Sequence, residues 1–167
     1  ENFQSLQGII AANRDAGRNQ LYAQYGLLMI LAYALFYLIG HIAHFVIPVI
    51  GHDYVSIYFV SLVNCFVTSF TAVYLFRFAL AFTESSKRAL LLAAIFGFST
   101  FAADFALKSG FSEPMHGLTF FASFYHAYRF KKTGDSSHLL YSGLFSAASI
   151  LTKFYSMIGV AFISLYI

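Results

Sequence analysis

Charged residues are scarce in this sequence of 167 residues. Lysine, arginine, aspartate and glutamate make up 10% of the chain, whereas hydrophobic residues make up 59%, and the mean hydropathy is +0.70. A soluble domain usually contains about a quarter charged residues, because polar side chains must cover its surface. The composition therefore excludes an ordinary soluble domain and predicts a protein whose surface is covered by lipid.

Cysteine is also nearly absent. The single residue, Cys65, lies in an apolar run, which excludes a disulfide framework or a thiolate metal site within one chain. No internal repeat and no linker rich in proline, serine or glycine divides the sequence. The net charge of +3 is spread over several short runs, so we expect one integral membrane domain and no nucleic-acid partner.

Apolar stretches of about 20 residues, the length that crosses roughly 30 Å of hydrocarbon, occur four times. They cover residues 54–76, 89–107, 114–130 and 138–167. The last stretch is interrupted at Thr152 and Lys153, so it fits either two short helices or one span with a re-entrant turn. The sequence predicts an all-α, polytopic transmembrane protein.

Basic residues indicate how these spans are oriented, because they favour the cytoplasmic side of a membrane. Six of them follow the first and third spans: Arg77, Lys87, Arg88, Arg129, Lys131 and Lys132. If the spans alternate, these six share the inner side, and Lys108 and Lys153 lie on the outer side. We expect a multi-pass protein of the plasma or inner membrane.

Residues 1–53 are expected to form an outer-face region that precedes the transmembrane region of residues 54–167. Residues 21–50 fit either a full crossing or a kinked hairpin embedded in the outer leaflet, and we favour the hairpin. Before them, Phe3, Leu6, Ile9 and Ile10 recur at the spacing of a helix lying on the membrane interface. His41, His44, His52 and Asp53 fit a zinc site, but interfacial anchors are favoured because no ligand spacing is diagnostic.

The stretch KSGFSEP, residues 108–114, places Lys108 and Glu113 between two apolar segments. A carboxylate and an ammonium at a lipid–water boundary can serve as a proton acceptor and a phosphate contact. Helix-end chemistry is the alternative, because Ser112 or Glu113 can cap a helix that has Pro114 in its first turn. Lys108 can likewise extend to the boundary as a helix flank.

Six motifs follow one another in an order that is more specific than any one of them. They are AQYGLLMIL, AVYLFRFALAF, SKRALLLAAIF, KSGFSEP, YRFKKTGD and YSGLFSAASILTKFYSMI. From about Gln24 to Lys153 the chain resembles the GT-C class of membrane glycosyltransferases, in particular the protein O-mannosyltransferase and aminoarabinose transferase-like families. The resemblance implies a GT-C-like core fragment with interfacial helices. It also implies transfer of a sugar from a polyprenyl-phosphate donor to an acceptor at the outer face.

Roles for individual residues also follow from the resemblance. It implies catalytic roles for Glu113 and for Glu1, which fits the second residue of the family's Asp-Glu motif. Since the sequence begins without methionine and ends in an apolar run, we expect it to be a piece of a larger protein. The resemblance implies substrate contacts for Gln24, Tyr25, Lys108, His116 and Lys153.

Two questions stay open at the level of the sequence. Some family members carry an acidic metal ligand near the turn where this chain has Gln24, so participation of a divalent metal is undecided. A transporter subunit or a non-catalytic membrane scaffold is the alternative function. A transporter more often shows two related halves with paired broken helices, and no such repeat is visible.

Overall fold

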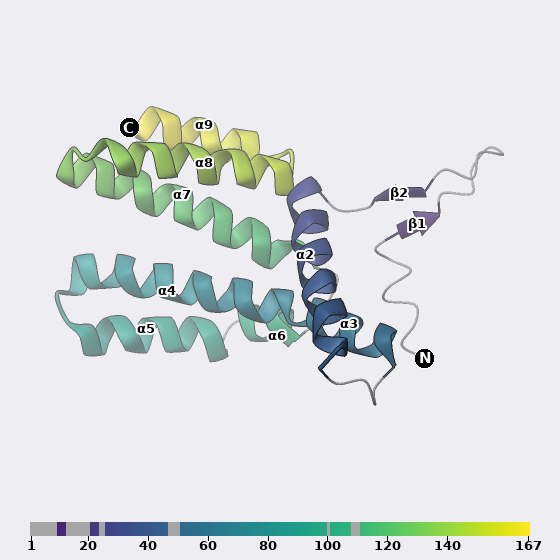
Figure 1. Cartoon of the computed structure of the whole chain (residues 1–167). Coiled ribbons are helices and arrows are strands. Elements are labelled where there is room, and N and C mark those ends of the chain that lie inside the picture. Colours follow the sequence, from purple (N-terminus) through teal and green to yellow (C-terminus); the bar gives the residue numbers. More distant parts are fainter. Residues whose placement is uncertain (1–9, 13–20, 24–25, 47–50, 100, 108–110) are drawn as a thin grey trace.

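The computed structural model describes residues 10–12, 21–23, 26–46, 51–99, 101–107 and 111–167. This part of the chain is almost entirely helical (Figure 1). Its elements are β1 (Ile10–Ala12), β2 (Leu21–Ala23), α2 (Leu27–His44), α3 (His52–Ser61), α4 (Val63–Thr83), α5 (Ser86–Ser99), α6 (Phe101–Leu107), α7 (Glu113–Thr133), α8 (Ser136–Thr152) and α9 (Ser156–Tyr166). The predicted all-α class is confirmed for the residues from 26 onward.

The strands β1 and β2 correct the prediction of an amphipathic helix near the N-terminus. They pair in antiparallel fashion, with Ile10 opposite Ala23 and Ala12 opposite Leu21. The spacing of apolar residues assigns Ile10 to a helix face, but a β-branched side chain also suits a strand. The remaining residues of that predicted helix lie outside the described part of the chain.

Helices α4, α5, α7, α8 and α9 lie side by side, and successive helices of this bundle run in opposite directions (Figure 1). Glu84 and Gly134 end α4 and α7 in the left-handed conformation, with φ of 50° and 71°, which turns the chain within a few residues. Lys153 ends α8 in an extended conformation. Residues 138–167 therefore form two helices that reverse direction at Lys153.

The chain reversals sort charged residues to opposite ends of the bundle. Lys87 and Arg88 lie in the first turn of α5, and Lys131 and Lys132 lie in the last turn of α7. Glu113 begins α7 and therefore lies at the other end, where α8 also finishes (Figure 1). This is the separation that the spacing of the basic residues predicts.

Helix α2 crosses the Glu113 end of the bundle instead of running along it (Figure 1). It packs mainly against α3 and also contacts α4 and α8. A Cβ atom at Gly40 would lie 2.6 Å from the Cα of Ser56, so the missing side chain lets α2 and α3 approach closely. Helix α2 continues through this glycine and has 18 residues in all.

A small apolar core forms where α2, α3, α4 and α7 meet. Its buried members are Met29, Tyr33, Val60, Val63, Val67 and Met115. Met29 and Val63 are almost completely inaccessible to solvent. Because Met115 belongs to the first turn of α7, this core fixes the position of Glu113.

Helices α7 and α8 pack through small and hydroxylated residues. The Ser123 hydroxyl donates to the Ser142 carbonyl oxygen at 3.0 Å, and the Ser142 hydroxyl donates to the Ser123 carbonyl oxygen at 3.0 Å. The hydroxyls of Ser123 and Ser146 lie 2.7 Å apart. Small residues and hydroxyl contacts of this kind are typical of helix pairs in membranes, where backbones approach closely.

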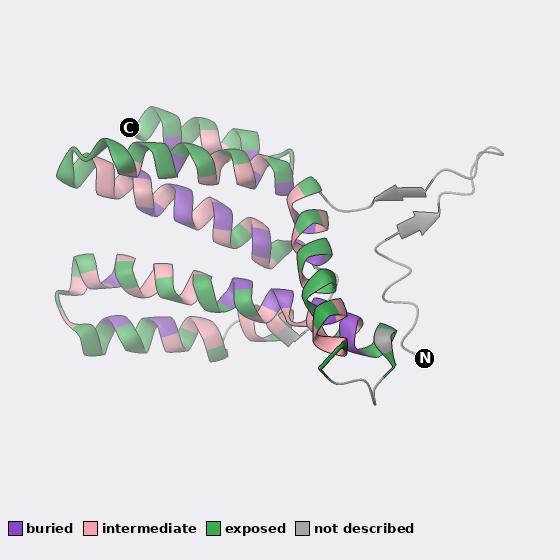
Figure 2. Cartoon of the chain, in the orientation of Figure 1, coloured by how far each residue is buried: buried purple, intermediate pink, exposed green. Residues whose placement is uncertain are grey.

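Many positions on the helices are exposed (Figure 2), and large apolar residues occupy a large share of them. On α2 they form a stripe at helical spacing that comprises Leu27, Leu31, Leu35, Leu38 and Ile42. Other examples are Leu90, Leu91, Leu140, Leu144, Phe162 and Leu165. A water-soluble monomer rarely exposes apolar surface this extensively, which supports association with a membrane.

Two helical stretches are long and apolar enough to cross a membrane, namely Leu27–His44 and Asp53–Thr83. The second contains the predicted span 54–76. Helices α5 and α8 have 14 and 17 residues, and α7 has the length but a less apolar composition. The described helices therefore support membrane association.

Candidate functional site

The Glu113 end of the bundle holds an ion pair between two distant parts of the sequence. The Lys153 Nζ atom donates a hydrogen bond to the Glu113 Oε1 atom at 2.6 Å. The pair joins the beginning of α7 to the turn between α8 and α9. Two of the residues to which the resemblance assigns roles, Glu113 and Lys153, are therefore in direct contact.

Helix ends position both partners. Glu113 and Pro114 form the first turn of α7, as the Ser-Glu-Pro order predicts. The Ser112 side chain makes no capping hydrogen bond, so the predicted alternative of a serine cap is not observed. Lys153 leaves the helical conformation at the end of α8, with φ of −146°, which directs its side chain across to α7.

The ion pair changes the pKa of both groups. Partial burial would raise the pKa of Glu113, but the Lys153 hydrogen bond and charge outweigh it and hold the pKa below the ordinary value. Burial would lower the pKa of Lys153, but the bonds to Glu113 and Tyr155 outweigh it and raise the pKa. Both groups are therefore charged at neutral pH.

His116 lies one helical turn after Glu113, and its ring packs between two aromatic rings. The ring centroids of Tyr155 and Phe120 lie 5.4 Å and 6.0 Å away. Its Nε2 atom is buried and has no hydrogen-bond partner among the described residues. A buried polar atom without a partner is uncommon in folded proteins, which makes this atom a candidate for contact with a bound molecule.

A mostly apolar cavity of about 360 Å³ opens beside Glu113. Helices α4, α5, α6 and α7 contribute its lining, which comprises Thr68, Thr71, Phe96, Ala102, Phe105, Glu113, Pro114 and Gly117. Of these lining residues, Glu113 alone carries a charge. The carboxylate thus lies between an apolar hollow and the Lys153 ammonium, an arrangement that suits a molecule with a long apolar chain and an anionic head.

Several of the predicted site residues lie outside the described part of the chain, namely Glu1, Gln24, Tyr25 and Lys108. Gly26 directly follows two of them and is described. A Cβ atom at Gly26 would overlap the carbonyl oxygens of Leu151 and Thr152. The beginning of α2 therefore packs against the end of α8, immediately before Lys153.

Three residues of this region were not predicted from the sequence. Tyr155 contacts His116, and its ring lies 5.6 Å from the Lys153 ammonium. Thr68 and Thr71 face the cavity from α4. Their spacing of three residues places both on one side of a helix, a signal that could have identified them.

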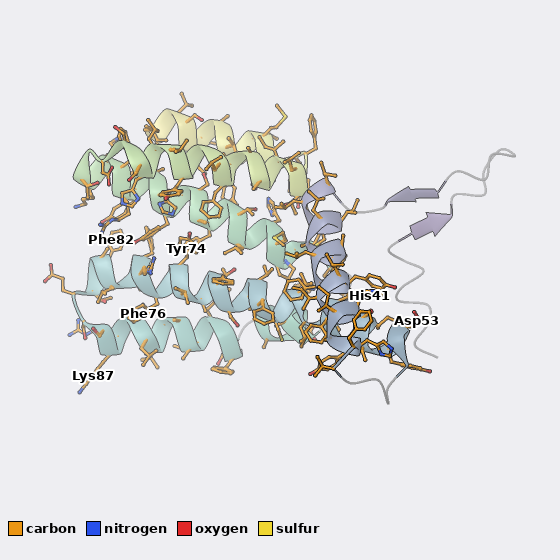
Figure 3. The ribbon with its side chains drawn as sticks, viewed as in Figure 1. His41, Asp53, Tyr74, Phe76, Phe82 and Lys87 are labelled. Atoms are coloured by element: carbon orange, nitrogen blue, oxygen red, sulfur yellow. The ribbon has the colours of Figure 1, made fainter. Side chains whose placement is uncertain are left out.

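The histidines near the end of α2 do not form a recognisable metal site. His41 and Asp53 lie at the end of the molecule opposite Lys87 (Figure 3). Among the described residues, no group of three or more histidine, cysteine, aspartate or glutamate side chains could hold a metal ion. The structure does not describe the His52 side chain. The described residues therefore do not provide a set of ligands for the zinc site that the sequence left as an alternative.

Comparison with family models, curated proteins and solved structures gives no significant match for this chain.

Proposed function

We propose that this chain is the membrane-embedded part of a GT-C-like glycosyltransferase. It transfers a sugar from a polyprenyl-phosphate donor to an acceptor at the Glu113 end of the bundle. The proposal rests on the position of Glu113, which lines the apolar cavity and also forms an ion pair with Lys153. A polyprenyl chain would enter the cavity while its phosphate and sugar remain at the boundary.

The proposal includes a multi-pass arrangement of the bundle. In this arrangement α4, the pair α5–α6, α7 and α8 cross the bilayer, α9 with its 11 residues enters it from the Glu113 end, and the basic end with Lys87 and Lys131 faces the cytoplasm. Helix α2 then lies embedded across the outer end of the bundle. The antiparallel order of the helices and their exposed apolar side chains support this arrangement.

The proposed reaction uses the two charged groups in different ways. An acceptor oxygen bonds to the anomeric carbon while the bond from that carbon to the phosphate oxygen breaks. The electron pair of that bond leaves with the polyprenyl phosphate, whose negative charge the Lys153 ammonium stabilises. The Glu113 carboxylate accepts the proton of the acceptor hydroxyl.

Exchange of partners at Lys153 would couple donor binding to this chemistry. In the described structure Lys153 donates to Glu113 and keeps the pKa of the carboxyl group low, which makes the carboxylate a weak base. When Lys153 turns to the donor phosphate, the carboxylate loses this hydrogen bond and its pKa rises. Glu113 then becomes a better proton acceptor only after the donor has bound.

The first test replaces the carboxylate without changing its shape. In the full-length protein, Glu113→Gln is expected to reduce transfer from a polyprenyl-phosphate-linked sugar by about 10²–10⁴-fold, the range of positioned acid–base groups. Expression and binding of the donor lipid should stay near normal. Glu84→Gln is the matched control, because Glu84 is a carboxylate at the opposite end of the bundle.

The same assay separates an enzyme from a scaffold or a transporter. Lys153→Ala is expected to weaken use of the donor, because it removes a phosphate contact and not a proton acceptor. Normal transfer in both the Glu113→Gln and the Lys153→Ala proteins would reject the proposed roles and leave a structural ion pair. The roles implied for Glu1, Gln24, Tyr25 and Lys108 stay predictions.

A further inference from the structure

A second cavity, with two arginines in its lining, lies toward the opposite end of the bundle, between α4 and α7. Its volume is about 290 Å³, and its lining comprises Arg77, Leu80, Ala81, Tyr125 and Arg129. Arg77 comes from α4 and Arg129 from α7. Two arginines therefore line one hollow from facing helices, Arg77 as an exposed residue and Arg129 as a half-buried one.

Neither arginine is neutralised by a carboxylate of the described chain. Glu84 and Asp135 are the carboxylates at this end, and neither forms an ion pair with Arg77 or Arg129. The Arg129 Nε atom is buried and has no hydrogen-bond partner among the described residues. A buried cationic donor without a partner is costly, so this position favours an anion that is supplied from outside the chain.

The tyrosine and histidine side chains beside the hollow bring no negative charge to it. The Tyr74 hydroxyl lies 3.4 Å from the His126 Nε2 atom, and the charges of Arg77 and Arg129 both act on the His126 ring. The His126 and His138 Nδ1 atoms lie 2.9 Å apart, so these rings satisfy each other. The hollow thus leaves the two guanidinium groups available to a ligand.

Aromatic surface borders the hollow. Tyr74 and Phe82 lie in the space between α4 and α7 (Figure 3). The Tyr74 ring lies 5.5 Å from the Tyr125 ring, and the Phe82 ring lies 5.3 Å from the Tyr128 ring. Phe82 is also 62% exposed, which provides apolar surface at this end of α4.

We propose that Arg77 and Arg129 form an anion site for a phosphate group, such as the headgroup of an anionic membrane lipid. Guanidinium groups bind phosphate oxygens through paired hydrogen bonds. Basic hollows between membrane helices are known locations for anionic lipid headgroups. The site is separate from the Glu113 end and goes beyond the proposed transfer reaction.

The test measures lipid retention by the full chain after purification in detergent. Native mass spectrometry with phosphatidylglycerol and with phosphatidylcholine should show preferential retention of phosphatidylglycerol. The double variant Arg77→Gln, Arg129→Gln should bind it at least about tenfold more weakly, because two charge-assisted contacts are lost. Competition with inorganic phosphate then distinguishes the two possible sources of the phosphate group. Displacement of the lipid indicates that free phosphate suffices, whereas lack of displacement indicates a lipid headgroup.

Matched variants distinguish a specific binding site from nonspecific electrostatic attraction of anionic lipids. The double variant Lys87→Gln, Lys132→Gln removes the same charge from the same end without altering the lining, and it should retain the lipid. Lys153→Ala should also retain it, because that lysine belongs to the opposite end. Arg129→Lys keeps the charge and changes the native protein least. It should show an intermediate loss of lipid binding. Equal retention of both lipids by the native protein, or equal losses in the two double variants, would overturn the proposal.

Discussion

At the scale of single residues, the ion pair between Glu113 and Lys153 contributes more to placement than to stability. The Glu113 side chain is 48% exposed, and that of Lys153 is 18% exposed. Pairs with such access to solvent stabilise a fold by about 0–1 kcal/mol. The pair instead holds two chemically different groups within one hydrogen bond of each other beside a cavity.

The pKa directions of the pair predict how its small contribution depends on pH. The pKa of folded Glu113 lies below its ordinary value of 4.5, so the contribution is complete above pH 4.5 and is lost as the pH falls through the lowered value. The pKa of folded Lys153 lies above 10.5, so that contribution is complete below pH 10.5 and is lost above it. Thermal unfolding of the native and Glu113→Gln proteins should therefore differ at neutral pH and converge under strong acid. A difference that persists at the lowest pH would show that the carboxylate stabilises the fold in another way.

At the scale of the helices, the cavity depends on the glycine that α7 presents to α4 and α6. Gly117 lines the cavity, and a Cβ atom there would meet no atom within 4 Å. Leucine at this position would fill the hollow without displacing the backbone. Gly117→Leu should therefore raise the KM for a long-chain polyprenyl donor while leaving transfer from a short-chain, water-soluble donor almost unchanged.

A second glycine provides the matched control for this experiment. A Cβ atom at Gly97 of α5 would also meet no atom within 4 Å, and Gly97 does not line the cavity. Gly97→Leu should leave the KM for both donors near the native value. Equal effects of the two substitutions on the long-chain donor would show that the cavity does not bind the polyprenyl chain.

The helices show what could be predicted from the sequence and what could not. The start of α7 at Glu113 follows from the local order Ser-Glu-Pro, whereas its end at Thr133 lies beyond the predicted limit of residue 130. The contact between Glu113 and Lys153 depends on the reversal between α8 and α9, which apolar runs alone left ambiguous. The division of residues 89–107 between α5 and α6 was not predicted, because a continuous apolar run does not specify where a helix ends. The strand at Ile10 was not predicted either.

At the scale of the whole molecule, the separation of charge predicts that the two ends of the bundle face opposite sides of the membrane. Ser86 and Phe154 are exposed residues at opposite ends. In a Cys65→Ser background, Ser86→Cys and Phe154→Cys should react with an impermeant thiol reagent from opposite sides of sealed vesicles. Reaction of both residues from the same side would reject the proposed multi-pass arrangement.

The position of α2 also constrains the order in which the protein matures during synthesis. Gly26 packs against Leu151 and Thr152, which the ribosome adds more than a hundred residues later. At about 5–20 residues per second, α2 waits on the order of ten seconds for that surface to emerge. During this interval the Met29 side of α2 can already pack against α3 and α4, but the beginning of α2 lacks its final partner, so we expect the nascent α2 to depend on lipid or an insertion chaperone at that end.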